Sequence, residues 1–235
     1  MKILVLGDIH LKPRHFDRAD KILASGQADF CVQMGDLVDD WGEEHNIGLY
    51  ERTLKRAIKF KEDHPETLWV TGNHDFGYLR SDYGPRESGH SKIAELFVRP
   101  LFRQLPQQIL HIVDGVFFTH AGLTQEWVDM LQRRTGVEEA LSDKQLLELV
   151  NIAAPDDLWL ENSPIWARPQ VDEYIMYPAK LQVVGHTPVK TAGQDNGVLS
   201  TDTLSTNHMG VPVGDQRLVI VDTETGGWHY AEDEV

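Results

Sequence analysis

Hydrophobic and polar positions follow two different repeats in the first third of the chain. Short, continuous apolar runs, which are typical of strands buried on both faces, occur at 2–6, 30–34 and 68–70. Between them, residues 16–25 and 47–63 place apolar side chains on one face of a helix, and Pro65 ends the second segment. The chain therefore opens as an alternation of strands and helices.

The section from 77 to 108 interrupts this alternation. It is rich in Gly, Pro and Arg, which predicts loops with one or two short helices. A hairpin follows, because the apolar segments 109–113 and 116–119 flank Asp114-Gly115, a dipeptide that favours a tight turn.

Two helices and several strands are predicted for the rest of the chain. Thr124 is the expected N-cap of a helix over 124–134 that stops at Gly136, and a Ser142-x-x-Gln145 capping box opens a second helix to about 152. Residues 155–177 predict an irregular lid or rim. Further strands are expected at 181–184, 198–200, 217–221 and 227–230.

No repeat or linker divides the sequence, so residues 1–235 are expected to form one domain. Alternating strands and helices followed by more strands indicate an α/β protein with two packed sheets and helices outside.

Composition narrows the classes of function. The chain has 37 acidic and 22 basic residues and a net charge of −15, which argues against a basic nucleic-acid groove. No apolar stretch reaches the roughly 18 residues that cross a membrane, and the apolar run at the N-terminus is too short for a signal peptide. The single cysteine, Cys31, cannot form an internal disulfide. These features predict a cytoplasmic protein without membrane or nucleic-acid partners.

Candidate chemistry follows five of the apolar runs. Directly after them stand Gly7-Asp8-Ile9-His10, Gly35-Asp36-Leu37-Val38-Asp39, Gly72-Asn73-His74-Asp75, His120-Ala121-Gly122 and Gly185-His186-Thr187. Open α/β sheets bind ligands at the carboxyl ends of their strands, so these side chains are expected to converge. Mixed carboxylate, imidazole and amide ligands suit Mn²⁺, Fe or Zn²⁺.

The motifs GDIH, GDLVD, GNHD, HAG and GHT resemble the signature of the calcineurin-like metallophosphoesterases. The resemblance implies a four-layer α/β/β/α sandwich with two mixed central sheets. It also implies two metal ions, Mn²⁺ first and Fe or Zn²⁺ as alternatives, bridged by a hydroxide that attacks phosphorus. The implied ligands are Asp8, His10 and Asp36 for the first metal, and Asp36, Asn73, His120 and His186 for the second.

Three further residues receive roles from the same resemblance. His74 would donate a proton to the leaving group, and Asp39 would hold its ring. The segment SPIWAR, 163–168, is similar to one that carries a phosphate-binding arginine, here Arg168. Without the resemblance, Asp39 is a turn-capping residue and Arg168 a surface arginine.

FTHAGL and VVGHTP place the chain nearest to Ser/Thr protein phosphatases and symmetrical diadenosine tetraphosphate hydrolases, but with departures. Asp40 stands where those sequences usually carry a phosphate-binding Arg, and Asp75 where protein phosphatases usually carry Glu. Pro188 replaces the second His of the phosphodiesterase form GHxH. The candidates to replace the missing cation are Arg14, Arg80 and Arg86.

These observations predict a phosphoesterase that hydrolyses phosphomonoesters, with a phosphorylated small molecule, nucleotide or phosphoprotein as substrate. The alternatives are a symmetrical dinucleoside polyphosphate hydrolase and a non-catalytic scaffold on the same fold. The first alternative needs an adenine pocket, for which the aromatic candidates are Trp159, Trp166, Tyr174 and Tyr177. The sequence leaves the oligomeric state open.

Overall fold

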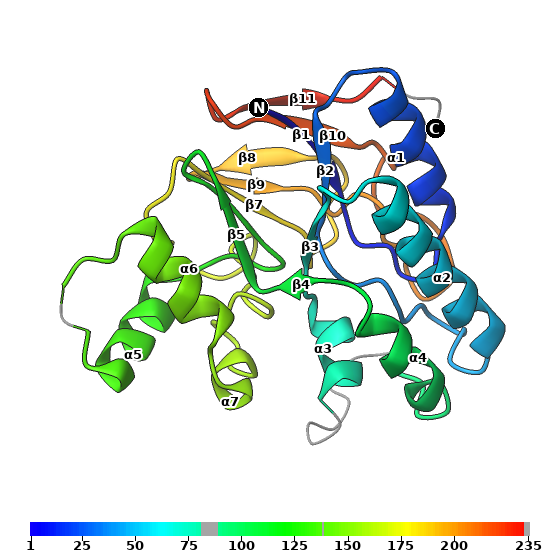
Figure 1. The fold of residues 1–235 in the computed structure, drawn as a ribbon, viewed down its shortest axis with the longest axis horizontal. Helices are drawn as coiled ribbons and strands as arrows, with labels where there is room; N and C mark the ends of the chain where they lie inside the picture. The colour runs from blue at the N-terminus through cyan, green and yellow to red at the C-terminus, as the bar shows by residue number, and fades with distance from the viewer. Residues whose placement is uncertain (81–88, 138, 233–235) are drawn as a thin grey trace.

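Two β-sheets form the centre of the protein, and helices cover their outer faces (Figure 1). The structure is a computed structural model that describes residues 1–80, 89–137 and 139–232. The layer order is helices, sheet, sheet, helices, which confirms the predicted four-layer α/β/β/α class.

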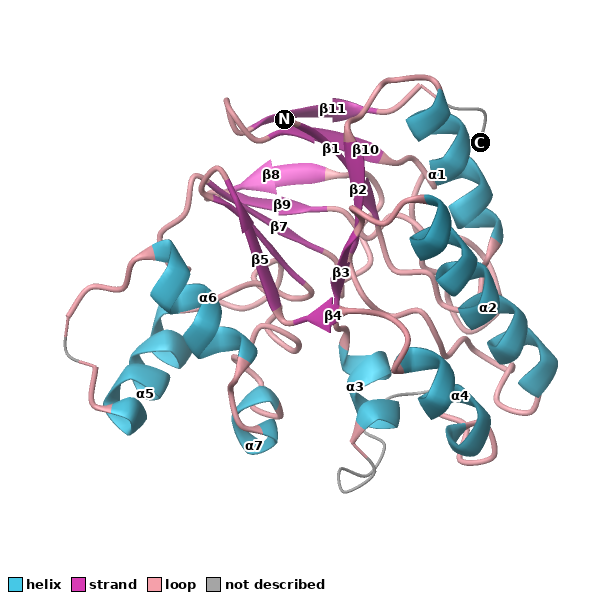
Figure 2. Ribbon diagram, viewed as in Figure 1, coloured by secondary structure: helices cyan, strands magenta, loops and turns pink. Residues whose placement is uncertain are grey.

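The first sheet has the strand order β11-β10-β1-β2-β3-β4. The strands β1 to β4 run parallel, and β10 pairs antiparallel with β1. Their bounds are β1 Lys2–Leu6, β2 Phe30–Gln33, β3 Leu68–Val70, β4 Gln107–Gln108, β10 Val219–Asp222 and β11 Gly227–Tyr230. The helices beside this sheet are α1 Arg14–Ala24, α2 Ile47–Asp63, α3 Asn73–Leu79 and α4 Glu95–Phe102 (Figure 2).

The second sheet has the order β5-β6-β7-β9-β8 and is also mixed, because β6, β7 and β9 are parallel and the edge strands are antiparallel. Its strands are β5 Leu110–Val113, β6 Val116–Thr119, β7 Leu181–Val184, β8 Gly193–Asp195 and β9 Val198–Ser200. The helices on this side are α5 Gln125–Thr135, α6 Asp143–Asn151 and α7 Pro155–Leu158.

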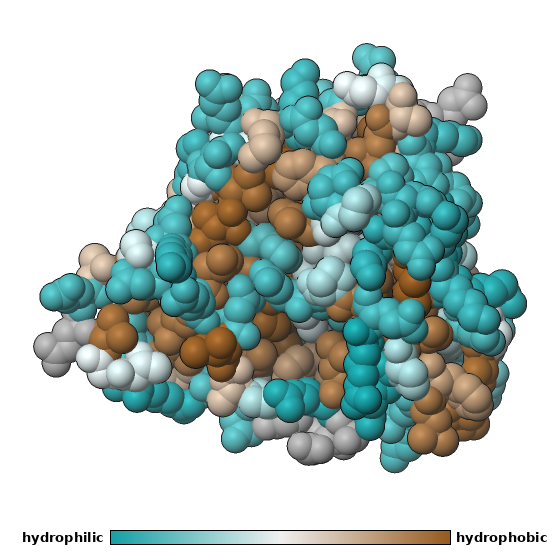
Figure 3. Space-filling model, viewed as in Figure 1, coloured by the Kyte–Doolittle hydropathy of each residue, from teal (hydrophilic) through white to brown (hydrophobic). Residues whose placement is uncertain are grey.

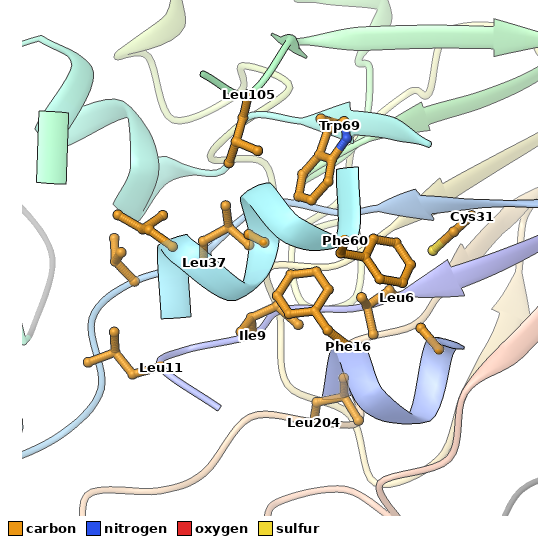
Figure 4. Packing of buried hydrophobic residues seen from close by; sticks show 14 of the residues in the cluster. Leu6, Ile9, Leu11, Phe16, Cys31, Leu37, Phe60, Trp69, Leu105 and Leu204 are labelled. Carbon is orange, nitrogen blue, oxygen red and sulfur yellow. The ribbon is translucent and has the colours of Figure 1, made fainter. Parts of the chain in front are cut away.

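Alternating side chains of β1 supply two separate cores. Leu4 and Leu6 pack with α1 and α2, while Ile3 and Val5 face the second sheet. Figure 4 shows the outer core, in which Phe16 lies against aromatic neighbours beneath the helices. Each fully buried large apolar side chain contributes about 1.5–3 kcal/mol. Because both faces of β1 are covered, its sequence is a continuous apolar run.

The strongest sequence patterns give the closest agreement. The helix over 47–63 and the strand over 68–70 have the predicted bounds, and Asp114 and Gly115 form the predicted turn with φ values of 53° and 80°. Thr124 caps α5 by accepting from the Trp127 N–H, and Gly136 ends that helix with φ 71°.

One prediction is corrected, and two elements appear where none was predicted. The segment after β3 is helical from Asn73, because the Asp75 carboxylate accepts from the Gly72 N–H, 3.2 Å away, and caps α3. The expected irregular lid begins with the short helix α7, which Pro155 opens at a position where no N–H is needed. The strand β8 was missed because its three exposed residues lack any apolar pattern.

The surface over α1 and α2 is largely polar in the view of Figure 3, while apolar side chains gather at the lower right over α4. Leu96 and Phe97 are the exposed apolar residues of that helix. Within the described part of the chain, no helix is both long and apolar enough to cross a membrane.

Candidate metal centre

The loops after the parallel strands meet at one edge of the two sheets. The N–H groups of Ile9 and His10, after β1, both donate to the Asp36 carbonyl after β2, each at 2.9 Å. The Gly185 N–H, after β7, donates to the His120 carbonyl after β6 at 2.8 Å. These backbone bonds tie neighbouring strand ends of each sheet together at the site.

Three histidines direct the same ring atom toward one carboxylate oxygen. Asp36 Oδ2 lies 3.3 Å from Nε2 of His120, 3.8 Å from Nε2 of His10 and 4.0 Å from Nε2 of His74. The other ring nitrogen of each histidine is already engaged. His120 Nδ1 donates to the Met34 carbonyl at 2.7 Å, and His10 Nδ1 donates to the Asp39 carbonyl at 2.8 Å.

This arrangement fits bound cations. A neutral histidine that donates from Nδ1 presents a lone pair at Nε2, so electron-rich atoms face one another around Asp36. Asn73 adds its Oδ1, 3.0 Å from His120 Nε2. Two further buried atoms, Asp8 Oδ1 and His186 Nε2, have no hydrogen-bond partner among the described residues.

Asp36 is shared by two groups of potential ligands. Ligand atoms of His10, Asp36 and His74 lie within 4.8 Å of one another, and so do those of Asp36, His120 and His186. These two groups contain four of the six proposed ligands, His10, Asp36, His120 and His186, and add His74 to the first; Asn73 lies beside His120. Asp8 instead uses Oδ2 to accept from the His186 N–H at 2.9 Å.

Negative charge is concentrated in the interior of this site. Burial raises the pKa of Asp8 well above its usual value, and the nearby carboxylates of Asp202 and Asp36 raise it further. For His120 burial is the largest single effect and lowers the pKa, but the charges of Asp36 and Asp8 and the hydrogen bonds to Asp36 and Met34 together outweigh it and raise the pKa to about 10. Cations placed here would relieve the repulsion among the carboxylates.

Asp202 is a site neighbour that the sequence reading missed. Its carboxylate is buried and accepts from the N–H and the hydroxyl of Ser205 at 3.2 and 2.8 Å. The available signal was its position, because Asp202 follows β9 in the way that Asp8 follows β1.

Four site residues adopt the left-handed backbone conformation that is uncommon outside glycine. The φ angles are 40° for His10, 51° for Asp36, 63° for Asp39 and 65° for His186. Asp and His tolerate this region better than most residues. The tight loops therefore turn the functional side chains toward the site at a cost in backbone energy.

Asp39 lies beside His74, as the resemblance implied, and is held by residues that the sequence did not reveal. Asp39 Oδ2 accepts from His74 Nδ1 at 3.0 Å. Its Oδ1 accepts from the hydroxyls of Tyr50 at 2.9 Å and Tyr78 at 2.5 Å. Tyr50 belongs to the apolar face of α2, so its pattern indicated core packing alone.

A pocket of about 200 Å³ opens beside these groups. Its lining residues are His10, Asp36, Asp39, Asp40, Trp41, Asn73, His74, Arg168, His186, Pro188, Ser205 and Thr206. Arg168, half-buried, donates from Nη1 to the Thr187 hydroxyl at 3.4 Å. The predicted substrate-binding arginine thus lies in the same pocket as His74.

Neither Arg14 nor Arg80 lines this pocket, and Arg86 lies outside the described residues. Asp40, which stands where the related sequences usually carry an arginine, pairs with Lys12, whose Nζ lies 2.8 Å from Asp40 Oδ2. The charge of Asp40 is therefore compensated within the protein.

The aromatic candidates for an adenine pocket lie elsewhere. Trp159 packs on Phe76 with ring centroids 5.6 Å apart, and Tyr177 stacks on Phe117 at 6.4 Å. Trp166 borders the site, with its ring 5.8 Å from that of His186. None of these, nor Tyr174, lines the pocket that contains His74 and Arg168.

Comparison with known proteins places this geometry in context. A family model described as calcineurin-like phosphoesterase matches residues 1–190. The chain is similar to a solved hypothetical protein from Pyrococcus horikoshii OT3, with 13% identity, a TM-score of 0.50, and coverage of 99% of this chain and 88% of that chain. It is also similar to a novel archaeal phosphodiesterase, with 15% identity, 98% coverage of both chains and a TM-score of 0.42. A phosphoesterase from E. coli gives 16% identity, 94% and 88% coverage and a TM-score of 0.43. At these identities the likeness is one of fold, and no curated protein matches the sequence.

Proposed function

Because the chain belongs to the calcineurin-like phosphoesterases, we propose that it hydrolyses phosphomonoesters, in the manner of the Ser/Thr protein phosphatases. Membership of the family makes it a metal-dependent phosphoesterase, a hydrolase of phosphoric ester bonds. The finer assignment rests on one observation, which is that Arg168 and His74 line a single small pocket with Asp36.

Two cations are proposed to bind on either side of Asp36. Their ligands would be the residues Asp8, His10, Asp36, Asn73, His120 and His186, and Mn²⁺ is the first choice, with Fe or Zn²⁺ as alternatives. Cations held there would lower the pKa of the attacking water and neutralise charge on the phosphoryl oxygens.

The protein's own groups would bind the phosphate and move one proton. A phosphomonoester presents three acceptor oxygens, and the guanidinium of Arg168 can donate to two of them at once. As water adds to phosphorus and the ester P–O bond breaks, His74, protonated on both ring nitrogens, would give its Nε2 proton to the leaving oxygen. Asp39, which accepts from Nδ1, would keep the ring in that orientation.

The proposal is tested by comparing p-nitrophenyl phosphate with bis-p-nitrophenyl phosphate in Mn²⁺. The expected result is a higher kcat/KM for the monoester, because a diester has less charge for Arg168 to bind. Arg168→Ala should lower the monoester rate by about 10- to 100-fold, the effect of a lost hydrogen bond between charged groups, and lower the diester rate less. Arg52→Ala, on the exposed face of α2, is the control. A wild-type enzyme that prefers the diester would contradict the monoester assignment and leave the metal site intact.

A further inference from the structure

The mouth of the catalytic pocket carries a large aromatic residue for which the chemistry has no use. Trp41 lines the pocket together with His74 and Arg168, yet 47% of its surface is exposed. A half-exposed indole at a binding pocket is unlike a core tryptophan, and exposed apolar groups grouped together mark contact sites.

Asp40 holds the backbone that carries this indole. Its Oδ1 accepts from the backbone N–H of Trp41 and from the Thr206 hydroxyl, both at 3.0 Å, and its Oδ2 pairs with Lys12. The carboxylate therefore joins the segment after β2 to the segment after β9. The residue that replaces the expected phosphate-binding arginine is a structural tie between two loops.

The tie places two aromatic rings together. The ring of His208, two residues after Thr206, lies 6.4 Å from that of Trp41 with an interplanar angle of 79°. The same loop exposes three apolar side chains, Met209, Val211 and Val213. Trp41, at the pocket mouth, thus has an aromatic neighbour on a loop that exposes apolar side chains, in a protein whose net charge is −15.

The size of the pocket determines which part of a substrate reaches Trp41. Its volume of about 200 Å³ is smaller than the roughly 300–1,000 Å³ of pockets that enclose whole ligands. A phosphoryl group fits inside, but the rest of the substrate must extend outward, where Trp41 lies.

We propose that Trp41 and His208 form a stacking site for a planar aromatic ring on the leaving group. Preferred substrates would then be phosphomonoesters of nucleosides or phenols rather than of aliphatic alcohols. This inference rests on the proposed phosphomonoesterase function and assigns its substrate class.

The test uses 5′-AMP and ribose 5-phosphate, which share the same leaving hydroxyl and differ in the base. The ratio of their kcat/KM values should be about 10 in the wild type, as expected for one base–aromatic stack, and should fall toward 1 in Trp41→Ala. Trp41→Phe should retain most of the ratio, and Trp228→Phe, on the distant strand β11, should leave it unchanged. An unchanged ratio in Trp41→Ala would overturn the proposal.

A second measurement does not depend on turnover of a nucleotide. Adenosine, which lacks phosphate, should inhibit the wild type competitively and inhibit Trp41→Ala about tenfold more weakly. If no monoester is hydrolysed, the proposed function fails, and adenosine inhibition of diester hydrolysis still decides whether Trp41 stacks. Phenyl phosphate distinguishes a phenol ring from a nucleoside base. If Trp41→Ala slows phenyl phosphate more than 5′-AMP, the site prefers phenols, and the reverse result indicates that it prefers nucleosides.

Discussion

The two sides of the catalytic pocket are built in opposite ways. The inner wall, Asp36, Asp39 and His74, is buried or half-buried, and its polar atoms are held by hydrogen bonds to the surrounding core. The outer wall, Asp40, Trp41 and His208, joins two loops and leaves its rings in solvent. The contrast suggests a division of labour. Under the proposed function, the inner wall would bind the phosphoryl group that all substrates share, and the outer wall would contact the part in which they differ.

The largest effect is expected from the residue that the two ligand groups share. Asp36→Asn removes a carboxylate from both groups, so metal content measured by elemental analysis should fall from up to two ions per chain to few or none. Activity on every substrate should fall by more than the roughly 100-fold typical of residues that only support metal ligands. Asp195→Asn, an exposed change on β8, is the matched control. Active wild-type protein without any metal would contradict the site.

His74→Asn should distinguish substrates by leaving group rather than by shape. Esters of poor leaving groups should slow by about 10²–10⁴-fold, because they need a proton as the P–O bond breaks. Esters of p-nitrophenol should slow much less, and the preference for AMP over ribose 5-phosphate should persist. Equal losses on good and poor leaving groups would indicate that His74 binds phosphate or supports the fold instead.

A smaller loss is expected from the positioning residue Tyr78. Tyr78→Phe leaves Asp39 Oδ1 with one donor fewer, and a hydrogen bond to a charged group is worth about 1.5–3 kcal/mol. If Asp39 orients His74, kcat for poor leaving groups should fall about tenfold, while p-nitrophenyl phosphate is little affected. The same change in a His74→Asn background should have no further effect. Tyr174→Phe is the control. Equal losses of kcat on good and poor leaving groups would indicate a general loss of packing.

The smallest effect on activity is expected outside both walls, at the buried His15 in the first turn of α1. Burial, aided by Arg18, lowers the pKa of His15 from 6.5 to about 3. Between these values the unfolded chain binds a proton that the folded chain does not, so the free energy of unfolding falls as the pH drops below 6.5. The loss at pH 5 relative to pH 8 is about 2 kcal/mol.

Urea denaturation at both pH values would measure this effect. His15→Leu should reduce the difference by that amount and leave activity at pH 8 unchanged. Identical pH dependence in the variant and the wild type would assign the acid sensitivity to other groups.

Sequence patterns predicted the inner wall better than the outer wall, for a physical reason. Asp8, Asp36 and His120 each follow a buried apolar strand, and parallel strands bring their carboxyl ends to one edge. The same strands predicted two packed sheets with helices outside, and the family resemblance implied the four-layer class. The side chains that support the site obey no such local rule. Tyr50 reads as a core residue until its hydroxyl is seen to meet Asp39.

The outer wall depends on contacts between distant segments. Lys12, Asp40 and Thr206 are polar residues in loops, and their local sequence does not indicate that they bond to one another. Asp40 could be identified only as a departure from a motif. The helical start at Asn73 was not predicted either, although the carboxylate that caps it, Asp75, lies only three residues after Gly72.

The left-handed backbone at His10, Asp36, Asp39 and His186 has an evolutionary consequence. Each such residue costs about 1–3 kcal/mol, which is a considerable share of the stability of a typical domain. Glycine would adopt these angles without strain but would supply no ligand. A lineage released from selection for hydrolysis should therefore become more stable as it loses activity, with glycine arriving first at these four positions.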